Sequence, residues 1–194
     1  VGERLFLKGE RCQSQKCAIV KRNYPPGLHG PKGKPRLSDY GQQLTEKQKA
    51  KRQYGLLEKQ FRLTFDKAKK KSGNAGDNFL ALLESRLDNV VYRLGWASSR
   101  AQARQLVGHG HFTVNGRKAS IPSMALKTGD VVKVKANKIG GQYFKLLAEK
   151  KKAELPAWLS AEAAGQSAKV LGRPDAVSIA PNFNIQMIIE YYSR

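Results

Sequence analysis

Two pairs of side chains have the types and the spacing that could bind a metal ion. Cys12 and Cys17 lie five residues apart, and His109 and His111 lie two apart. Two thiolates cannot complete a tetrahedral Zn²⁺ site, and His29 is a third candidate ligand. No cluster of carboxylates lies near the histidine pair in the sequence. We expect these histidines to be polar loop residues or nucleic-acid contacts, and the cysteines to bind metal only with further ligands.

No arrangement of residues indicates catalysis. Gly33-Lys34 is reminiscent of a phosphate-binding loop, but Pro35 stands where Ser or Thr is needed and the glycine spacing is wrong. Asp88 lies between Arg86 and Arg93, where an ion pair that fixes a helix is a simpler interpretation than a general base. We predict that the protein is not an enzyme.

Positive charge is the dominant chemical feature. The 194 residues include 36 Lys and Arg against 15 Asp and Glu, for a formal net charge of +21. A polyanionic partner accounts for this excess, because Lys and Arg neutralise phosphates and release condensed counterions. An acidic membrane surface is the alternative partner, but the sequence has no apolar run that could span a bilayer. The two cysteines, with no signal-peptide pattern, favour a reducing, cytoplasm-like compartment.

The charge is concentrated in the first three quarters of the chain. Residues 1–36 carry nine basic and two acidic residues, and residues 44–71 carry ten and three. Residues 111–154 again carry ten and three, whereas residues 155–194 carry three of each. We expect the polyanion to contact the first three segments, and the neutral segment to face protein or complete a core.

The first 71 residues predict a tail followed by helices. Residues 1–43 predict an extended basic tail, because closely spaced prolines and glycines prevent a long helix or strand. Such a tail is either disordered or ordered along a phosphate backbone on binding. Residues 45–71 have apolar residues at helical spacing and predict two helices, with Thr45 as the N-cap and a break at Gly55.

The central region predicts helices followed by a β-hairpin. Asp77 caps a helical pattern that ends at Gly95, and Ser98 or Ser99 caps a short helix that runs to about His109. Asn115-Gly116 predicts a tight hairpin turn.

The rest of the chain predicts strands and a final helix. Residues 131–135 predict a strand whose basic residues would make one sheet face cationic. Residues 160–180 predict loops with short strands. The apolar run 184–194 fits a helix or a strand, and Asn184 as an N-cap favours the helix.

Two long stretches resemble the signature of one family. They read SRLDNVVYRLG at residues 85–95 and ARQLVGHGHFTVNG at residues 103–116. Shorter motifs at 24–30, 156–159 and 189–194 agree with them. The resemblance is to the family of the fourth protein of the bacterial small ribosomal subunit (S-four), and it extends over nearly the whole chain.

The resemblance implies an α+β fold with two domains. One is a helical domain, residues 44–84, completed by residues 178–194. The other, residues 85–177, contains a helix-loop-helix-hairpin RNA-binding module and a small antiparallel sheet. In family members with two further cysteines upstream, Cys12 and Cys17 match the second half of a structural Zn²⁺ site.

The resemblance also implies a function. It implies a structural constituent of the small ribosomal subunit, in the cytoplasm or in an organelle, that binds a multi-helix junction in the 5′ domain of the ribosomal RNA. It implies early action in assembly, a place near the channel through which mRNA enters, contact with neighbouring ribosomal proteins and with mRNA, and an effect on accuracy. Some bacterial members repress their own mRNA.

The candidate RNA contacts are polar and basic side chains of these segments. Arg100 and Arg104 lie one turn apart beside an apolar helix face, and we expect both to serve RNA rather than stability. The full set is Lys32, Lys34, Arg36, Lys47, Lys51, Arg52, Arg86, Arg93, Arg100, Arg104, Gln105, His109, His111, Arg117 and Lys118.

Two other classes of RNA-binding protein share part of this pattern. Some RNA-modifying enzymes and one class of tRNA synthetases carry the same module, but a catalytic domain needs on the order of 100 further residues. Only the neutral segment after residue 154 remains, and it contains no acid–base constellation. A stand-alone RNA chaperone would lack the basic helical region at 45–71.

Overall fold

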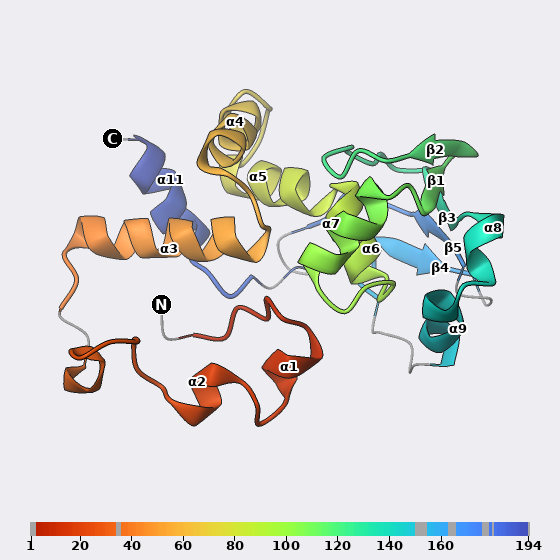
Figure 1. Cartoon of the computed structure of the whole chain (residues 1–194). Coiled ribbons are helices and arrows are strands. Elements are labelled where there is room, and N and C mark those ends of the chain that lie inside the picture. Colours follow the sequence, from red (N-terminus) through yellow and green to blue (C-terminus); the bar gives the residue numbers. More distant parts are fainter. Residues whose placement is uncertain are drawn as a thin grey trace. The chain divides into compact units, whose positions relative to one another are not determined.

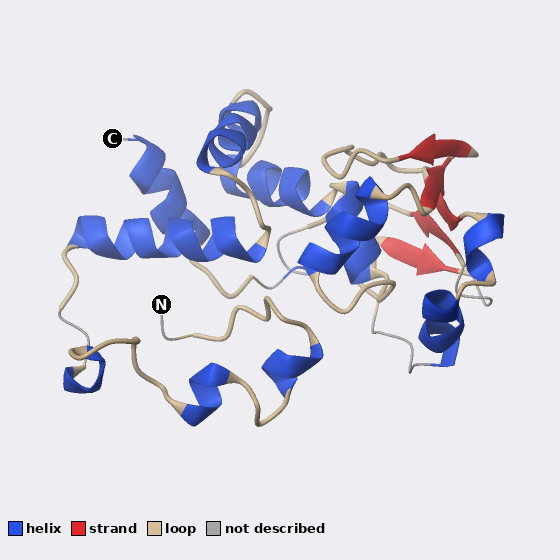
Figure 2. Cartoon of the chain, viewed as in Figure 1, coloured by secondary structure: helices blue, strands red, loops and turns tan. Residues whose placement is uncertain are grey.

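The chain folds into a helical unit and a unit that contains all of the strands described. The computed structural model describes residues 3–33, 36–149, 155–162, 166–175, 179 and 181–193. The first unit comprises Val1–Gly76 and Pro181–Arg194, and the second comprises Asp77–Ala180. Figures 1 and 2 show the elements of each unit. The predicted α+β class is confirmed. No helix in the described residues is long and apolar enough to cross a membrane.

The first unit is built from helices of very different length. Its N-terminal segment contains only short helices, as the prolines and glycines predict. This segment is bound to a longer helix by an ion pair between Glu3 and Lys49, at 2.8 Å. The helices are α1 (Glu10–Gln13), α2 (Ala18–Lys21), the 3-10 helix η1 (Gly30–Lys32), α3 (Asp39–Gln53), α4 (Glu58–Lys69) and α11 (Ile185–Ser193).

The predicted start of α3 is wrong, whereas the predicted break is confirmed. Ser38 caps α3, because its hydroxyl accepts a hydrogen bond from the Gly41 N–H. The Thr45 hydroxyl instead donates to the Gly41 carbonyl inside the helix. Gly55 has a φ of +64°, which favours glycine, and it separates α3 from α4.

The C-terminal helix α11 packs along α3 (Figure 1). Asn184 caps it, since its side-chain oxygen accepts a hydrogen bond from the Met187 N–H at 3.3 Å. The prediction of a helix here is therefore confirmed. The Tyr192 ring packs against Phe65 of α4, with ring centroids 4.9 Å apart. The end of the neutral C-terminal segment thus completes the core of the helical unit, whereas its strands β4 (Leu159–Ala161) and β5 (Ser167–Val170) belong to the other unit.

A polar cluster joins the same three helices. Lys47 is only 4% exposed, and its ammonium lies 2.8 Å from a Glu58 carboxylate oxygen and 4.5 Å from the centre of the Tyr191 ring. Glu58 also accepts hydrogen bonds from Lys51 and from the Tyr192 hydroxyl, both at 2.9 Å. Glu58 therefore ties α3, α4 and α11 together.

The helix predicted to be capped by Asp77 and to run to Gly95 is two helices, and Asp77 lies inside the first turn rather than at the cap. The two helices are α5 (Ala75–Glu84) and α6 (Leu87–Arg93). The backbone is extended at Arg86, which pairs with Ala125, and the Leu87 N–H donates to the Met124 carbonyl at 2.8 Å. This distant loop replaces helical hydrogen bonds, so the break could not be read from the local pattern. The predicted end at Gly95 is confirmed, with a φ of +73°.

A five-stranded antiparallel sheet follows helix α7 (Arg100–Gly108), with the strand order β2-β1-β3-β5-β4. The predicted hairpin is confirmed, because Asn115 and Gly116 have φ values of 49° and 80°, as a type I′ turn requires. The strands are β1 (Phe112–Val114), β2 (Arg117–Ala119), β3 (Val131–Val134), β4 (Leu159–Ala161) and β5 (Ser167–Val170).

The inner face of this sheet packs against α6 and α7 to form one core. Phe112, Val132 and Val170 of the strands are buried with Val90 and Val107 of the helices. The helices α8 (Ala136–Ile139) and α9 (Gln142–Glu149) follow β3, in a stretch for which the sequence predicted no element. The opposite sheet face includes the exposed Lys133, in agreement with the predicted cationic face.

The Glu58 cluster makes the stability of the helical unit depend on pH. Partial burial tends to raise the pKa of Glu58, but hydrogen bonds from Lys47, Lys51 and Tyr192 outweigh it and lower the pKa from 4.5 to about 2. The ionised carboxylate therefore stabilises the fold fully above about pH 4.5, and this stabilisation is lost as the pH falls towards 2. We expect the Tm of the native protein to exceed that of Glu58→Gln at pH 6 and the gap to close near pH 2.

Thermal unfolding followed by circular dichroism at several pH values measures this gap. Asp66→Asn, which removes an exposed carboxylate from the same helix, is the control and should show a smaller gap at pH 6. A Glu58→Gln gap that stays constant from pH 6 to pH 2 would contradict the assignment.

Candidate nucleic-acid interface

Four of the predicted arginines surround two buried carboxylates where α5, α6 and α7 meet. The carboxylates belong to Glu84, which is fully buried, and to Asp88, which is 5% exposed. A buried carboxylate is costly unless it is paired and hydrogen-bonded, so these two groups require cationic partners. The arginines that supply them are Arg86, Arg93, Arg100 and Arg104.

Glu84, at the end of α5, is held by side chains of α6. Arg93 donates from Nε and Nη2 to its two carboxylate oxygens, each at 2.9 Å. The Asn89 amide donates to the same carboxylate at 2.7 Å. A bidentate pair of this kind fixes the plane of the guanidinium as well as its position.

Arg100, the first residue of α7, joins the same network. Its Nε donates to the Asn89 side-chain oxygen at 2.8 Å, and its guanidinium lies 4.5 Å from the centre of the Tyr92 ring. Its Nη2 is 3.8 Å from Glu84, and its side chain is only 12% exposed. The sequence predicted that Arg100 serves RNA rather than stability, as an exposed side chain would. The side chain is instead largely buried and bonds α7 to Asn89 of α6, so we expect it to contribute to stability.

Asp88 pairs with the other two arginines. Arg86 donates to both carboxylate oxygens of Asp88, at 3.1 and 2.8 Å, and both residues are buried. The predicted ion pair at Asp88 is thus present with Arg86, whereas Arg93 pairs with Glu84. Arg104 lies 3.7 Å from Asp88, but its side chain is 51% exposed. Arg104 is therefore the arginine of the four whose guanidinium is open to a ligand.

Exposed polar groups continue from Arg104 along α7 to the hairpin. Gln105 and His109 are exposed, as are Arg117 and Lys118 of β2. A Cβ atom added to Gly110 would lie 2.9 Å from Cε of Lys118, so this lysine passes directly over the chain after α7. The structure thus brings Lys118 of the predicted hairpin next to the end of the helix.

His111 occupies a different environment from its neighbour. Its ring stacks with that of His109 at 6.2 Å, but His111 itself is half-buried. Burial lowers the pKa of His111, and the charges of Lys138 and Lys135 lower it further. The imidazole is therefore a neutral hydrogen-bonding group at neutral pH rather than a cation for phosphate.

The candidates of the helical unit divide into structural and exposed residues. Lys47 and Lys51 are committed to Glu58, so the prediction that both reach outward to RNA requires correction. Their partners lie on other helices, and helical periodicity alone could not find them. Exposed candidates in this unit are Lys32, Arg36 and Arg52, while Lys34 lies outside the described residues.

Sequence reasoning missed Glu84 and Asn89, the two residues that organise the arginines. The sequence does contain a pattern that could have revealed Glu84. This residue lies one turn after Leu80, on the apolar face of the helix. An acidic residue on a core face indicates a buried ion pair.

Known proteins match the chain from end to end. A model described as the ribosomal protein S4/S9 N-terminal domain matches residues 1–84, and one described as the S4 domain matches residues 85–132. A small ribosomal subunit protein uS4 of Clostridioides difficile is 54% identical over 193 residues, which cover 100% of this chain and 93% of the relative. A uS4 protein of Syntrophomonas wolfei is 52% identical over 194 residues, with the same coverage. The chain belongs to the ribosomal protein S4 family.

The S4 domain match covers the arginine cluster apart from Glu84. It includes α6, α7 and the hairpin, and it ends within β3. The family is not enzymatic, and the prediction that the protein is not an enzyme is confirmed. Glu84 is the last residue of the preceding match, and its carboxylate binds Arg93 of the S4 domain match.

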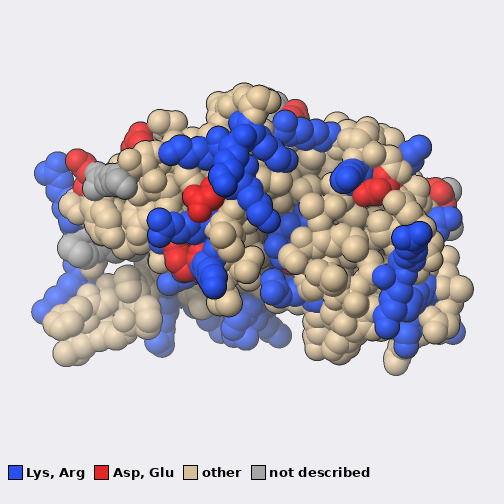
Figure 3. All heavy atoms as spheres, turned by 90° about the horizontal axis from the view of Figure 1, so that it is seen from above, with Lys and Arg blue, Asp and Glu red and all other residues tan. Residues whose placement is uncertain are grey.

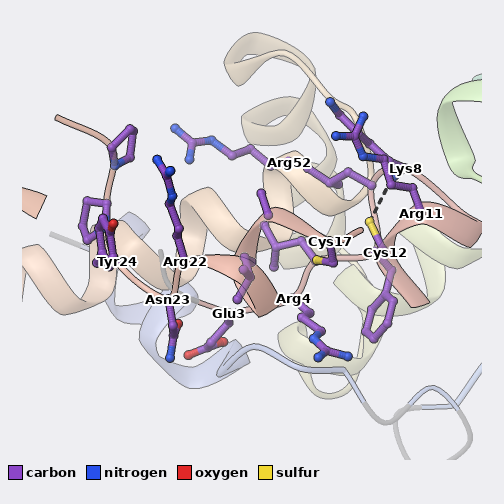
Figure 4. Close-up of a pocket in the computed structure, with 17 residues that line it drawn as sticks. Glu3, Arg4, Lys8, Arg11, Cys12, Cys17, Arg22, Asn23, Tyr24 and Arg52 are labelled. Atoms are coloured by element: carbon purple, nitrogen blue, oxygen red, sulfur yellow. Dashed lines mark hydrogen bonds between the residues drawn. The ribbon is translucent and has the colours of Figure 1, made fainter. Parts of the chain in front are cut away.

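The cysteines of the N-terminal segment do not form a metal site by themselves. Cys12 and Cys17 line a hollow of about 450 Å³ whose rim includes Arg4, Arg11 and Arg22 (Figure 4). The Cys12 sulfur accepts a hydrogen bond from the Lys8 N–H at 3.3 Å, and Cys17 is buried. The described residues contain no group of three or more metal-ligating side chains. Two thiols do not satisfy Zn²⁺, so zinc binding would require ligands beyond these residues.

The burial of the arginines predicts a contrast between two substitutions. Arg100→Ala should lower the free energy of unfolding by about 1–3 kcal/mol, because it leaves buried acceptors with fewer partners. Arg104→Ala should change it by less than about 0.5 kcal/mol, as is usual for an exposed side chain. Urea unfolding followed by the fluorescence of the buried tryptophans measures both. Equal losses for the two variants would show that Arg100 does not hold α7 in place.

Proposed function

We propose that this protein is an RNA-binding structural component of the small ribosomal subunit. The observation that carries the proposal is the arginine cluster of the S4 domain, in which the buried carboxylates bind Arg86, Arg93 and Arg100 and the helix so positioned presents the exposed Arg104. The net charge of +21 supports a polyanionic partner. The relatives compared above carry the name small ribosomal subunit protein uS4, which supports the ribosome as the site of action.

The proposed mechanism rests on shape and charge. Folded RNA presents phosphates and 2′-hydroxyls more readily than base edges, so a rigid set of cations recognises its geometry. Arg104, Gln105 and His109 of α7, with Arg117 of β2, would bind the RNA backbone. Because Arg100 fixes the helix that carries the first three groups, binding orders their side chains but not their backbone, and less entropy opposes the complex.

We further propose that the RNA is a multi-helix junction in the 5′ domain of small-subunit ribosomal RNA. A rigid domain that binds several RNA segments stabilises their folded arrangement by preferential binding, which would make the protein act in assembly. A place near the channel through which mRNA enters, contacts with neighbouring ribosomal proteins and an effect on translational accuracy belong to the same proposal. Zinc is a conditional part of it, in which Cys12 and Cys17 supply two of the four ligands.

Removal of exposed cations should weaken RNA binding without unfolding the protein. For Arg104→Ala combined with Arg117→Ala, we expect weaker binding to a bacterial small-subunit ribosomal RNA transcript. The slope of log affinity against log salt should become shallower by roughly 1.4–1.8, at 0.7–0.9 per phosphate contact. Filter binding at several salt concentrations measures the slope, and thermal unfolding checks the fold.

The control removes the same charge elsewhere in the strand-bearing unit. Lys127→Ala with Lys145→Ala changes two exposed lysines, one in the turn before β3 and one on α9. If the arginine variant bound the transcript as tightly as the native protein at every salt concentration, the RNA would not lie on this face.

A further inference from the structure

The outer face of the sheet carries a diagonal line of lysines. Lys118 of β2 and Lys133 of β3 both lie beside Thr113 of β1, which pairs with each of them. Lys169 of β5 pairs with Val131, two residues before Lys133 on β3. All three lysines are exposed. The register therefore places one lysine on each of β2, β3 and β5, on the face that points away from the core.

The spacing of this line suits a chain of phosphates. Lys118 and Lys133 are two strands apart, which is roughly 10 Å. Lys133 and Lys169 are diagonal neighbours on adjacent strands, roughly 7–8 Å apart. Hydroxyl groups of Thr113 and Ser160 lie in the same face between and beside the lysines. The Thr113 hydroxyl donates to the Lys133 carbonyl at 3.4 Å, so the face offers the three lysines and the exposed Ser160 hydroxyl to a ligand.

Acidic residues do not neutralise these lysines. Within the described part of the chain, Lys118, Lys133 and Lys169 form no ion pair. Asp130, which precedes β3, accepts hydrogen bonds from the Lys127 N–H and the Asn115 amide, so its carboxylate is engaged in the turn. The exposed Glu162, directly after β4, lies on the same face, opposite Ser167 and diagonal to Lys169, but it forms no ion pair with that lysine.

A nucleic acid fits this face better than an acidic protein does. Stable protein interfaces have a core of aromatic and other apolar side chains. Among the described residues of this unit, the exposed large apolar ones are Ile121, Leu146, Leu155 and Leu171, and all four lie outside the strands. Interfaces with nucleic acids are instead polar and strongly basic. Figure 3 shows how prominent basic side chains are on one view of the surface.

We propose that the outer sheet face, through Lys133 and Lys169, binds the sugar–phosphate backbone of a second RNA segment. This inference rests on the proposed function. The arginine cluster belongs to α6 and α7, which cover the inner face of the sheet, so the two surfaces lie on opposite sides of one core (Figure 1). One straight RNA helix cannot lie against both. The strand-bearing unit would therefore hold two RNA segments apart at a fixed distance, with Lys118 at the margin between the surfaces.

The test replaces the two lysines that belong to the outer face alone. Lys133→Gln with Lys169→Gln should leave the Tm nearly unchanged, because both side chains are exposed. The slope of log affinity for the small-subunit ribosomal RNA transcript against log salt should become shallower by roughly 1.4–1.8. Lys127→Gln with Lys145→Gln removes equal charge off this face and should change the slope by much less.

The outcomes separate this inference from the proposed function. If the Arg104 and Arg117 variant weakens binding but the Lys133 and Lys169 variant does not, the outer face is not an RNA surface and the proposed function stands. Equal effects of both lysine pairs would show diffuse charge rather than a site, and would overturn the inference. If the native protein failed to bind the transcript, the proposed function would fail first. Additive losses in log affinity for the combined arginine and lysine variant would support two separate surfaces.

Discussion

The full burial of the Glu84 carboxylate is the constraint on which the strand-bearing unit depends. An ionised group without solvent must be paired, and its partners come from α6 and α7 rather than from its own helix. Arg93 and Asn89 bind it directly, and Arg100 reaches it through Asn89. The same interaction that satisfies Glu84 therefore sets the position of α7. The exposed groups of α7 that we propose to bind RNA are thus positioned by a carboxylate that is fully buried.

The positive charge of the protein has two different uses. Lys47 and Arg86 are buried and paired, so they hold elements of the fold together. Arg104, Lys133 and Lys169 are exposed and remain available to a polyanion. A net charge of +21 correctly indicates a polyanionic partner, but it does not tell which cations face that partner. Burial makes this distinction, and it follows from contacts distant in the sequence.

Features encoded by neighbouring residues could be predicted, whereas those that depend on distant contacts could not. The Asn115-Gly116 turn and the Gly55 break were found because the required backbone angles select these residues locally. The break at Arg86 was missed because it depends on pairing with Ala125. The burial of Lys47 was missed because its partner Tyr191 is 144 residues away. The sequence predicted the ion pair at Asp88 but not the burial of Glu84, whose partners come from α6 and α7.

The central claim is that the largely buried arginines of the cluster are rigid and fix α7 before RNA binds. Nitrogen-15 relaxation of the guanidinium Nε–H groups in the RNA-free protein tests it most directly. The account predicts order parameters near 0.85 for Arg93 and Arg100, about those of rigid backbone, and below about 0.6 for Arg104. If Arg93 and Arg100 were as mobile as Arg104, the buried carboxylates would not position them, and the account would be contradicted.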